Sequence, residues 1–188
     1  MGVFDEAASC ASQAEPVEHK VLEAASRVFL EKAQLRLSVL VPASDGPARL
    51  RVALSGFDDI QAHLRKLRVK SNPDLTFPYR KVHALNLAVE HQEGGLYQDL
   101  SSFAGPALEN KMTLKFLIRR TLKKLRVRKV LVAPLPLAQG IGVVGLSGDT
   151  LFREMLPDMK TFCAGLAECL GRSHRSRTEA QIKARQDP

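Results

Sequence analysis

The sequence has no tryptophan, only three cysteines and no long run of apolar residues. A membrane-spanning helix needs about 20 consecutive apolar residues, so a membrane span is excluded. Cys10, Cys163 and Cys169 lack the Cys-x-x-Cys spacing of zinc and redox sites, and their odd number argues against a disulfide framework. The acidic first ten residues also differ from a secretory signal. We therefore expect a cytoplasmic protein that folds without a metal or a disulfide.

The common catalytic motifs are also missing. There is no Gly-x-Ser-x-Gly, no Walker loop and no His-Glu-x-x-His. His83 and His91 lie eight positions apart and have no matching cysteine or aspartate pair, so they do not suggest a metal site. The sequence does not identify which cofactor, if any, the protein binds. An enzyme could only use a thiol, with Cys163 as the candidate, and we predict instead that the protein is not catalytic.

The 188 residues are enough for one domain with a substantial core. Residues 1–16 are small, polar and acidic, and we interpret them as a flexible lead-in. Apolar periodicity begins at residue 17 and continues to Gly171, which defines the predicted domain, 17–171. Residues 172–188 form a basic tail that is either solvated or a helical continuation.

Hydrophobic periodicity predicts helices and strands in an α+β order. A helical stripe contains Val21, Leu22, Ala25, Val28 and Phe29. Alternating residues predict a hairpin of strands at 34–40 and 49–54. A short helix at 58–67, a helix within 79–92, a strand at 96–100 and an amphipathic helix at 108–125 follow. Strands at 127–137 and 141–146 form a second hairpin, and a last helix carries Met155, Met159, Phe162, Cys163, Leu166 and Leu170 before Gly171 caps it.

Two segments leave alternatives. Residues 85–89 alternate as a strand would, but we prefer a helix because Ala84 and Ala88 suit one and Gly94-Gly95 would end it. Pro134 and Pro136 lie within a Val- and Leu-rich strand, and proline cannot donate to a β-ladder. We expect that part of the strand at an edge of the sheet or at an irregular end.

Three stretches together resemble the GAF domain, a sensory and regulatory module. The late hairpin, Val132 to Asp149, has a Pro-Leu strand, a turn ending in glycine and an Ile-Gly-Val strand. Met155-Leu156 and Thr161-Phe162 are similar to the start of the family's closing helix. Residues 87–101 are similar to its helix, glycine turn and short strand ending in Asp-Leu. The resemblance spans about residues 17–171.

The resemblance implies an antiparallel sheet with helices on one face and a pocket on the other. It also implies a regulatory domain that senses a small ligand or docks a partner protein, and that dimerises through its terminal helices. The Asn-Lys-Phe-Asp-Glu signature of cyclic-nucleotide binders and the Cys-His pair of chromophore binders are absent. The cysteines also lie outside the positions expected for the methionine sulfoxide reductases of this family. Candidate pocket residues, by position in the family, are Tyr79, His83, Tyr97 and Asp99.

Residues 111–129 carry nine cations and no acid. On a helix, four of them would step by four residues along one ridge, and like charges at that spacing are destabilising. We favour a solvated face, in which the Lys and Arg stems cover apolar surface. The alternative is an anion-binding surface for an acidic partner or ligand or, less favoured, for nucleic acid. The candidate residues for such binding are Lys111, Lys115, Arg119, Lys123 and Arg126.

Overall fold

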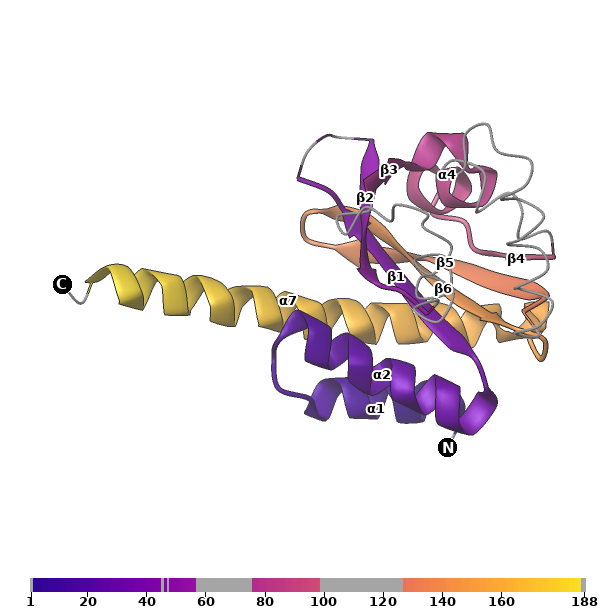
Figure 1. The fold of residues 1–188 in the computed structure, drawn as a ribbon, viewed down its shortest axis with the longest axis horizontal. Coiled ribbons are helices and arrows are strands. Elements are labelled where there is room, and N and C mark those ends of the chain that lie inside the picture. The colour runs from indigo at the N-terminus through magenta and orange to yellow at the C-terminus, as the bar shows by residue number, and fades with distance from the viewer. Residues whose placement is uncertain (1, 45, 47, 57–75, 99–126, 187–188) are drawn as a thin grey trace, which may run out of the picture.

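The computed structural model describes residues 2–44, 46, 48–56, 76–98 and 127–186. Its centre is a six-stranded antiparallel sheet in the order β3-β2-β1-β6-β5-β4 (Figure 1). The strands are β1 (Arg36–Pro42), β2 (Arg49–Leu54), β3 (Thr76–Pro78), β4 (Gly95–Tyr97), β5 (Lys129–Leu137) and β6 (Gly140–Gly148). The expected α+β class with an antiparallel sheet is confirmed.

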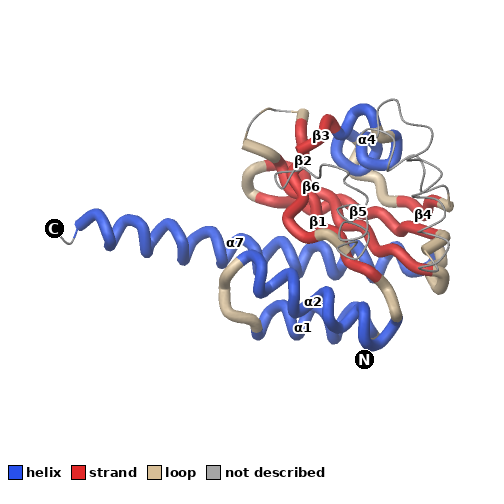
Figure 2. The backbone as a smooth tube through the Cα atoms, viewed as in Figure 1, coloured by secondary structure: helices blue, strands red, loops and turns tan. Residues whose placement is uncertain are grey.

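Three helices cover one face of the sheet: α1 (Val3–Gln13), α2 (Glu18–Ala33) and α7 (Leu156–Gln186) (Figure 2). Their apolar sides and the inward residues of β1, β5 and β6 form the larger core. Phe29 lies edge-to-face with Phe162 at a centroid distance of 5.1 Å, and Phe4 lies against Phe29 at 5.4 Å. Rings of this geometry contribute more than their buried area alone.

A fourth helix lies on the opposite face, so the described helices are not confined to one side as expected. The 3₁₀ turn η1 (Tyr79–Lys81) leads into α4 (His83–Glu90), whose Leu85 and Ala88 pack on Val130, Val132 and Val143. The helical interpretation of this segment is confirmed. The expected helices at 58–67 and 108–125 lie outside the described residues.

Strand boundaries follow from local backbone conformation. The second strand is confirmed at Arg49–Leu54, but β1 begins two residues later than the expected 34, because α2 runs to Ala33 and Gln34 ends it in the left-handed conformation, φ 54°. Gly142 permits the close approach of β6 to β1: a Cβ there would lie 2.5 Å from the Leu40 carbonyl oxygen.

The prolines of β5 lie where the expected edge is. β4 pairs with β5 only from Val130 to Val132, whereas Pro134 and Pro136 pair with β6 on the other side. Within the described part of the chain, nothing pairs with the outer side of these two residues. A stretch with no partner on its outer side is where a sheet tolerates proline.

The prediction of a flexible lead-in is wrong. Residues 3–13 form α1, and Phe4, Ala7 and Ala11 are buried against α2 and α7. Residue spacings of three and four place these side chains on one helical face. Small alanines carry a weak hydrophobic signal, so the segment looks polar in sequence although its narrow apolar face is fully used.

The last helix does not end at Gly171. α7 spans 31 residues and continues through Gly171 to Gln186, so the basic tail is a helical continuation up to that residue (Figure 1). A glycine that caps a helix takes a positive φ. Among the described glycines Gly140 does so, and Gly171 does not. Gly171 stays in the helix, at the usual modest cost of a glycine in a helix interior.

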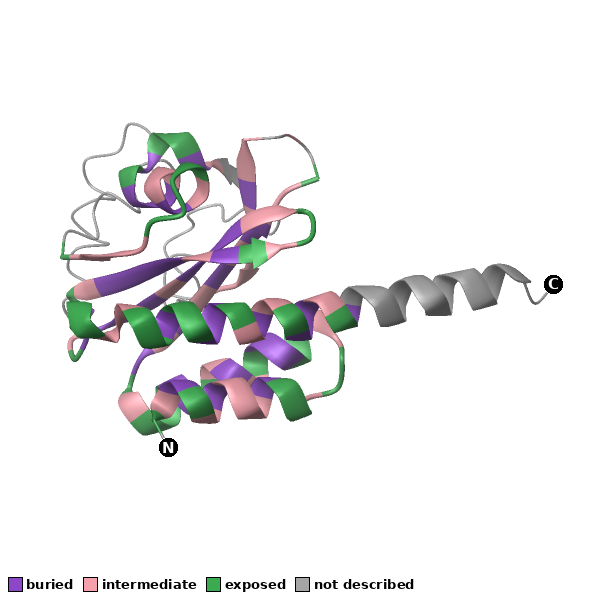
Figure 3. Ribbon diagram, turned by 180° about the vertical axis from the view of Figure 1, so that it is seen from behind, coloured by how far each residue is buried: buried purple, intermediate pink, exposed green. Residues whose placement is uncertain are grey.

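The apolar stripes of the first predicted helix and the last helix are not free to form a dimer interface. Figure 3 shows buried positions recurring along α1, α2 and the first half of α7. Val21, Leu22, Phe162 and Leu166 are all buried within the same chain. The stripes stabilise the domain itself, and this part of the dimer prediction is corrected.

Replacement of Phe4 tests whether α1 belongs to the core. We expect Phe4→Ala to lower the free energy of unfolding by about 3 kcal/mol, because it leaves a cavity beside Phe29. Urea denaturation followed by circular dichroism measures it. Gln13→Ala, at an exposed position of the same helix, is the control and should change little. Equal, small effects of both would mean that α1 does not stabilise the domain.

Candidate functional site

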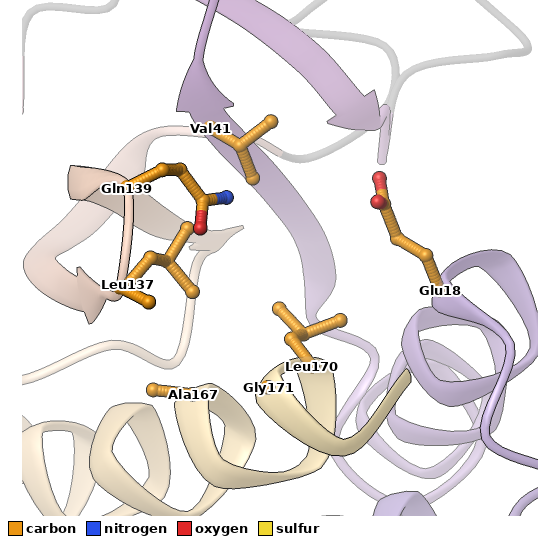
Figure 4. Close-up of a pocket in the computed structure, with 8 residues that line it drawn as sticks. Glu18, Val41, Leu137, Gln139, Ala167, Leu170 and Gly171 are labelled. Atoms are coloured by element: carbon orange, nitrogen blue, oxygen red, sulfur yellow. The ribbon is translucent and has the colours of Figure 1, made fainter. Parts of the chain in front are cut away.

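A pocket of about 580 Å³ lies beside α7, near the point where this helix leaves the sheet (Figure 4). Four structural elements and one turn form it. Its lining residues are Glu18, Val41, Leu137, Ala138, Gln139, Ala167, Leu170 and Gly171. This volume is within the range of about 300–1,000 Å³ that is usual for small-molecule sites. We refer to it as the α7-root pocket.

The local sequence explains how these elements leave a hollow. The β5–β6 turn is short, because Gly140 takes a φ of 134° that closes the hairpin directly after Gln139. Ala167 and Gly171 lie one helical turn apart on α7. Because alanine has only a methyl group and glycine has no side chain, they leave space between α7 and the β5–β6 turn. Val41 and Leu170 supply apolar walls from β1 and α7.

One edge of the pocket is held by an ion pair between α2 and β2. Arg51 Nη2 donates to both oxygens of Glu18, at 3.0 and 3.2 Å. Glu18 opens α2, where the helix N-terminus favours a negative charge. About a third of the Glu18 side chain remains exposed. The pair therefore fixes the carboxylate without removing it from solvent.

The lining is mostly apolar and has two polar side chains. Glu18 is the one lining residue with an ionisable side chain, and Gln139 supplies an amide. Within the described ranges, no group of three or more histidine, cysteine, aspartate or glutamate side chains is placed to hold a metal ion. What the pocket provides is an apolar cavity with a carboxylate and an amide at its rim.

Two of the sequence-predicted pocket residues, Tyr79 and Tyr97, lie on the opposite face of the sheet. Tyr79 is buried in the smaller core, and Tyr97 packs against that core while its ring covers Gly95. The structure brings these two residues to one cluster. His83 is exposed, and Asp99 lies outside the described residues. Burial, the larger cause, and the nearby Glu93 raise the pKa of Tyr97.

Tyr79 and Arg80 converge on the last residue of α4. The Tyr79 hydroxyl donates to Glu90 Oε1 at 2.8 Å, and Arg80 Nε donates to the same oxygen at 3.0 Å. Burial, followed by the hydrogen bond to Glu90, raises the pKa of Tyr79. The hydrogen bond from Tyr79 and then that from Arg80 lower the pKa of Glu90. The three groups tie η1 to the end of α4, which indicates a structural role for Tyr79.

The remaining candidates are five basic residues outside the described part of the chain and one buried cysteine. Lys111, Lys115, Arg119, Lys123 and Arg126 all lie outside the described residues. Cys163 is buried on α7, and desolvation raises its pKa to about 12. A thiol with this pKa is protonated at neutral pH and is a poor nucleophile. The alternative of thiol catalysis at Cys163 therefore has no support in the site.

Sequence reasoning missed the α7-root pocket because its residues carry no chemical motif. Leu170 was assigned to the core stripe, and Gly171 to a helix cap. The one usable signal was the pair of small residues at i and i+4, Ala167 and Gly171, on the last helix. Such a pair marks a helix surface that leaves room for another group.

Comparison with known proteins identifies the fold. No family model and no curated protein matches the sequence. Among solved structures, residues 122 to 287 of a methyl-accepting chemotaxis protein are 12% identical, with a TM-score of 0.58 over 92% of this chain and 98% of that one. A GAF domain from A. aeolicus in an inactive state is 14% identical, with a TM-score of 0.54 over 93% and 94% of the two chains.

A free methionine-R-sulfoxide reductase from Neisseria meningitidis, solved in complex with its substrate, is 14% identical. Its TM-score is 0.60, over 93% of this chain and 89% of that one. The chain has the GAF fold, as the sequence resemblance implied. Since these neighbours include an enzyme, the fold alone does not decide catalysis. None of the helices in the described ranges has the length and hydrophobicity to cross a bilayer.

Replacement of Glu90 tests the link between η1 and α4 through its pH dependence. The folded-state pKa of Glu90 is lowered from 4.5, so its ionised form stabilises the fold above that pH, and the stabilisation is lost as the pH falls through the folded-state value. We expect wild type to exceed Glu90→Gln in stability at pH 7, and the difference to shrink as the pH falls below about 4.5 and to vanish below the folded-state pKa. Urea denaturation across this range measures it.

The exposed carboxylate of Glu31 offers the matched control, Glu31→Gln. A stability difference between wild type and Glu90→Gln that persists unchanged at pH 3 would contradict the assignment, because Glu90 would then stabilise the fold by packing and not through its charge.

Proposed function

We propose that this chain is a non-catalytic sensory or regulatory domain that binds a small molecule in the α7-root pocket. One observation carries the proposal: three of the eight lining residues, Ala167, Leu170 and Gly171, belong to α7. They lie directly before the part of α7 that extends past the sheet and past α1 and α2 (Figure 1). An occupant therefore contacts the helix at its point of exit from the domain.

The other walls of the pocket belong to parts of the domain that α7 crosses. Val41 is on β1, Leu137 ends β5, Gln139 lies in the β5–β6 turn, and Glu18 begins α2. A molecule that touches all of them favours whichever position of α7 gives the best contacts. By linkage, the difference in ligand-binding free energy between two positions of α7 sets how far binding shifts the equilibrium between them. Such coupling free energies are typically 1–3 kcal/mol.

Filling the pocket tests this proposal. Ala167→Phe places a large ring in the space beside Leu170, so we expect a small molecule that co-purifies from the source organism to be lost. Native mass spectrometry of wild type and variant measures the bound mass. Ala164→Phe, the same change at an exposed position of α7, should retain it.

Hydrogen exchange makes the result independent of the ligand. Compared with wild type, Ala167→Phe should change amide protection in residues 167–186 and in the β5–β6 turn, but not in α4, because the new ring fills the pocket. An equal response of Ala164→Phe, or turnover of a substrate by the purified domain, would contradict the proposal.

We also propose that two copies pair through the terminal helices, using the outer half of α7. The apolar stripes are buried within each chain, whereas the backbone of residues 174–186 extends past the other described elements (Figure 1). An isolated helix of this length is marginally stable in water, and it gains from a partner helix. A second copy of the same chain supplies one.

The charge of this segment gives the pairing a distinctive salt dependence. Residues 172–186 carry five Lys or Arg and one Glu, so paired copies repel each other, and added salt screens the repulsion. We expect the dimer fraction in sedimentation experiments to rise between about 50 and 500 mM NaCl. The double variant Arg175→Gln/Arg177→Gln should already dimerise at low salt, whereas Lys160→Gln, on the first half of α7, should behave as wild type.

A second candidate function is binding of nucleic acid or of an acidic protein, and the observed helical form of the basic tail favours it. It predicts the opposite dependence: binding to duplex DNA or to an acidic partner weakens steeply with salt. The double variant would then lose binding, and association that salt abolishes would contradict the self-pairing proposal.

A further inference from the structure

We infer that the α7-root pocket selects a small molecule that has an apolar body and one protonated amine. The inference rests on the proposed function, since it assigns the chemical class of the molecule that this pocket takes. Three properties of the lining lead to it: apolar walls, a single carboxylate, and an amide on the other side of the apolar surface.

The walls require an apolar body. Val41, Leu137 and Leu170 contribute branched aliphatic side chains, and Ala167 contributes a methyl group. A ligand gains by removing this surface from water, at roughly 25 cal/mol for each Å² that is buried. A volume of about 580 Å³ accommodates a body the size of one or two aromatic rings.

The single carboxylate favours a cation. Glu18 is the only ionisable side chain among the described lining residues, and Arg51, its partner, is not part of the lining. An anionic ligand would face the Glu18 carboxylate, which repels it. A neutral ligand would leave the acceptor capacity of that carboxylate to water.

Glu18 can accept a second donor while it remains paired with Arg51. Arg51 contacts it through Nη2 alone, at 3.0 and 3.2 Å from its two oxygens. A carboxylate offers about four acceptor sites, so the contact leaves part of them open. The side chain is 34% exposed, and an ammonium group can therefore replace water at these sites.

The amide of Gln139 completes the arrangement. Figure 4 shows the Gln139 side chain and Glu18 on opposite sides of Val41 and Leu170, with the amide turned toward the apolar side chains. An amide both donates and accepts hydrogen bonds. A ligand with its amine at Glu18 can thus place a polar group of either kind near Gln139 at the far end of its body.

A matched series of probes tests the charge selection. 4-Phenylbutylamine, 4-phenylbutan-1-ol and 4-phenylbutyrate share one apolar body and differ in charge. Chemical-shift titration of the ¹⁵N-labelled full chain measures their dissociation constants. We expect the amine to bind about fivefold more tightly than the alcohol, the ratio given by an ion pair of about 1 kcal/mol, and the carboxylate to bind most weakly.

Two variants separate recognition from stability, because both break the same ion pair. Glu18→Gln should lower the affinity of the amine to that of the alcohol. Arg51→Met should raise the affinity of the amine, since it removes the competing cation and keeps the carboxylate. A general loss of structure would instead weaken binding in both variants, and circular dichroism monitors their folding.

The outcomes distinguish this inference from the proposed function. Equal affinities of the three probes, all lost in Ala167→Phe, would overturn the amine selection and leave the pocket as a ligand site. An amine preference that Glu18→Gln or Arg51→Met does not change would also overturn it. Shift changes that map away from the pocket, or binding that Ala167→Phe does not reduce, would overturn the proposed function itself.

Discussion

The packing of α7 on the sheet and on α1 and α2 is the contact on which the rest of the structure depends. Phe162 of α7 meets Phe29 of α2 edge-to-face, and Phe4 of α1 lies 6.4 Å from the Phe162 ring. The three rings join the first and last helices of the chain to one core. Because this core lies between the helices and the sheet, the position of α7 is determined by the whole domain and not by its own sequence.

The α7-root pocket lies where this packing stops. Up to Leu170 the helix is held by buried side chains. At Ala167 and Gly171 the residues are too small to fill the space between α7 and the other walls of the pocket. The cavity is therefore at the boundary between a firmly packed half of α7 and a half that extends past the sheet. The molecule that we propose to bind there would act on a helix that is fixed at one end, which is a favourable arrangement for passing a local contact to a distant segment.

The sequence allowed the main architecture to be predicted, because alternation and helical stripes report burial directly. The strand at 49–54, the late hairpin and the helix after Tyr79 all follow from such patterns. The helix α1 did not, since alanines at its buried positions carry little hydrophobic signal. The pocket could not be predicted either: it is an absence of side-chain volume between segments far apart in the chain, and only the Ala167–Gly171 spacing hints at it.

The two prolines of β5 have a further consequence for how copies of this protein meet. A strand whose outer side is open offers N–H and C=O groups to any extended chain, and so invites sheets to join end to end. Pro134 and Pro136 have no N–H to offer along this stretch, where β4 no longer covers β5. Among the described residues this stretch of β5 has no outer partner, and we expect its prolines to obstruct extension of the sheet into a neighbouring molecule there.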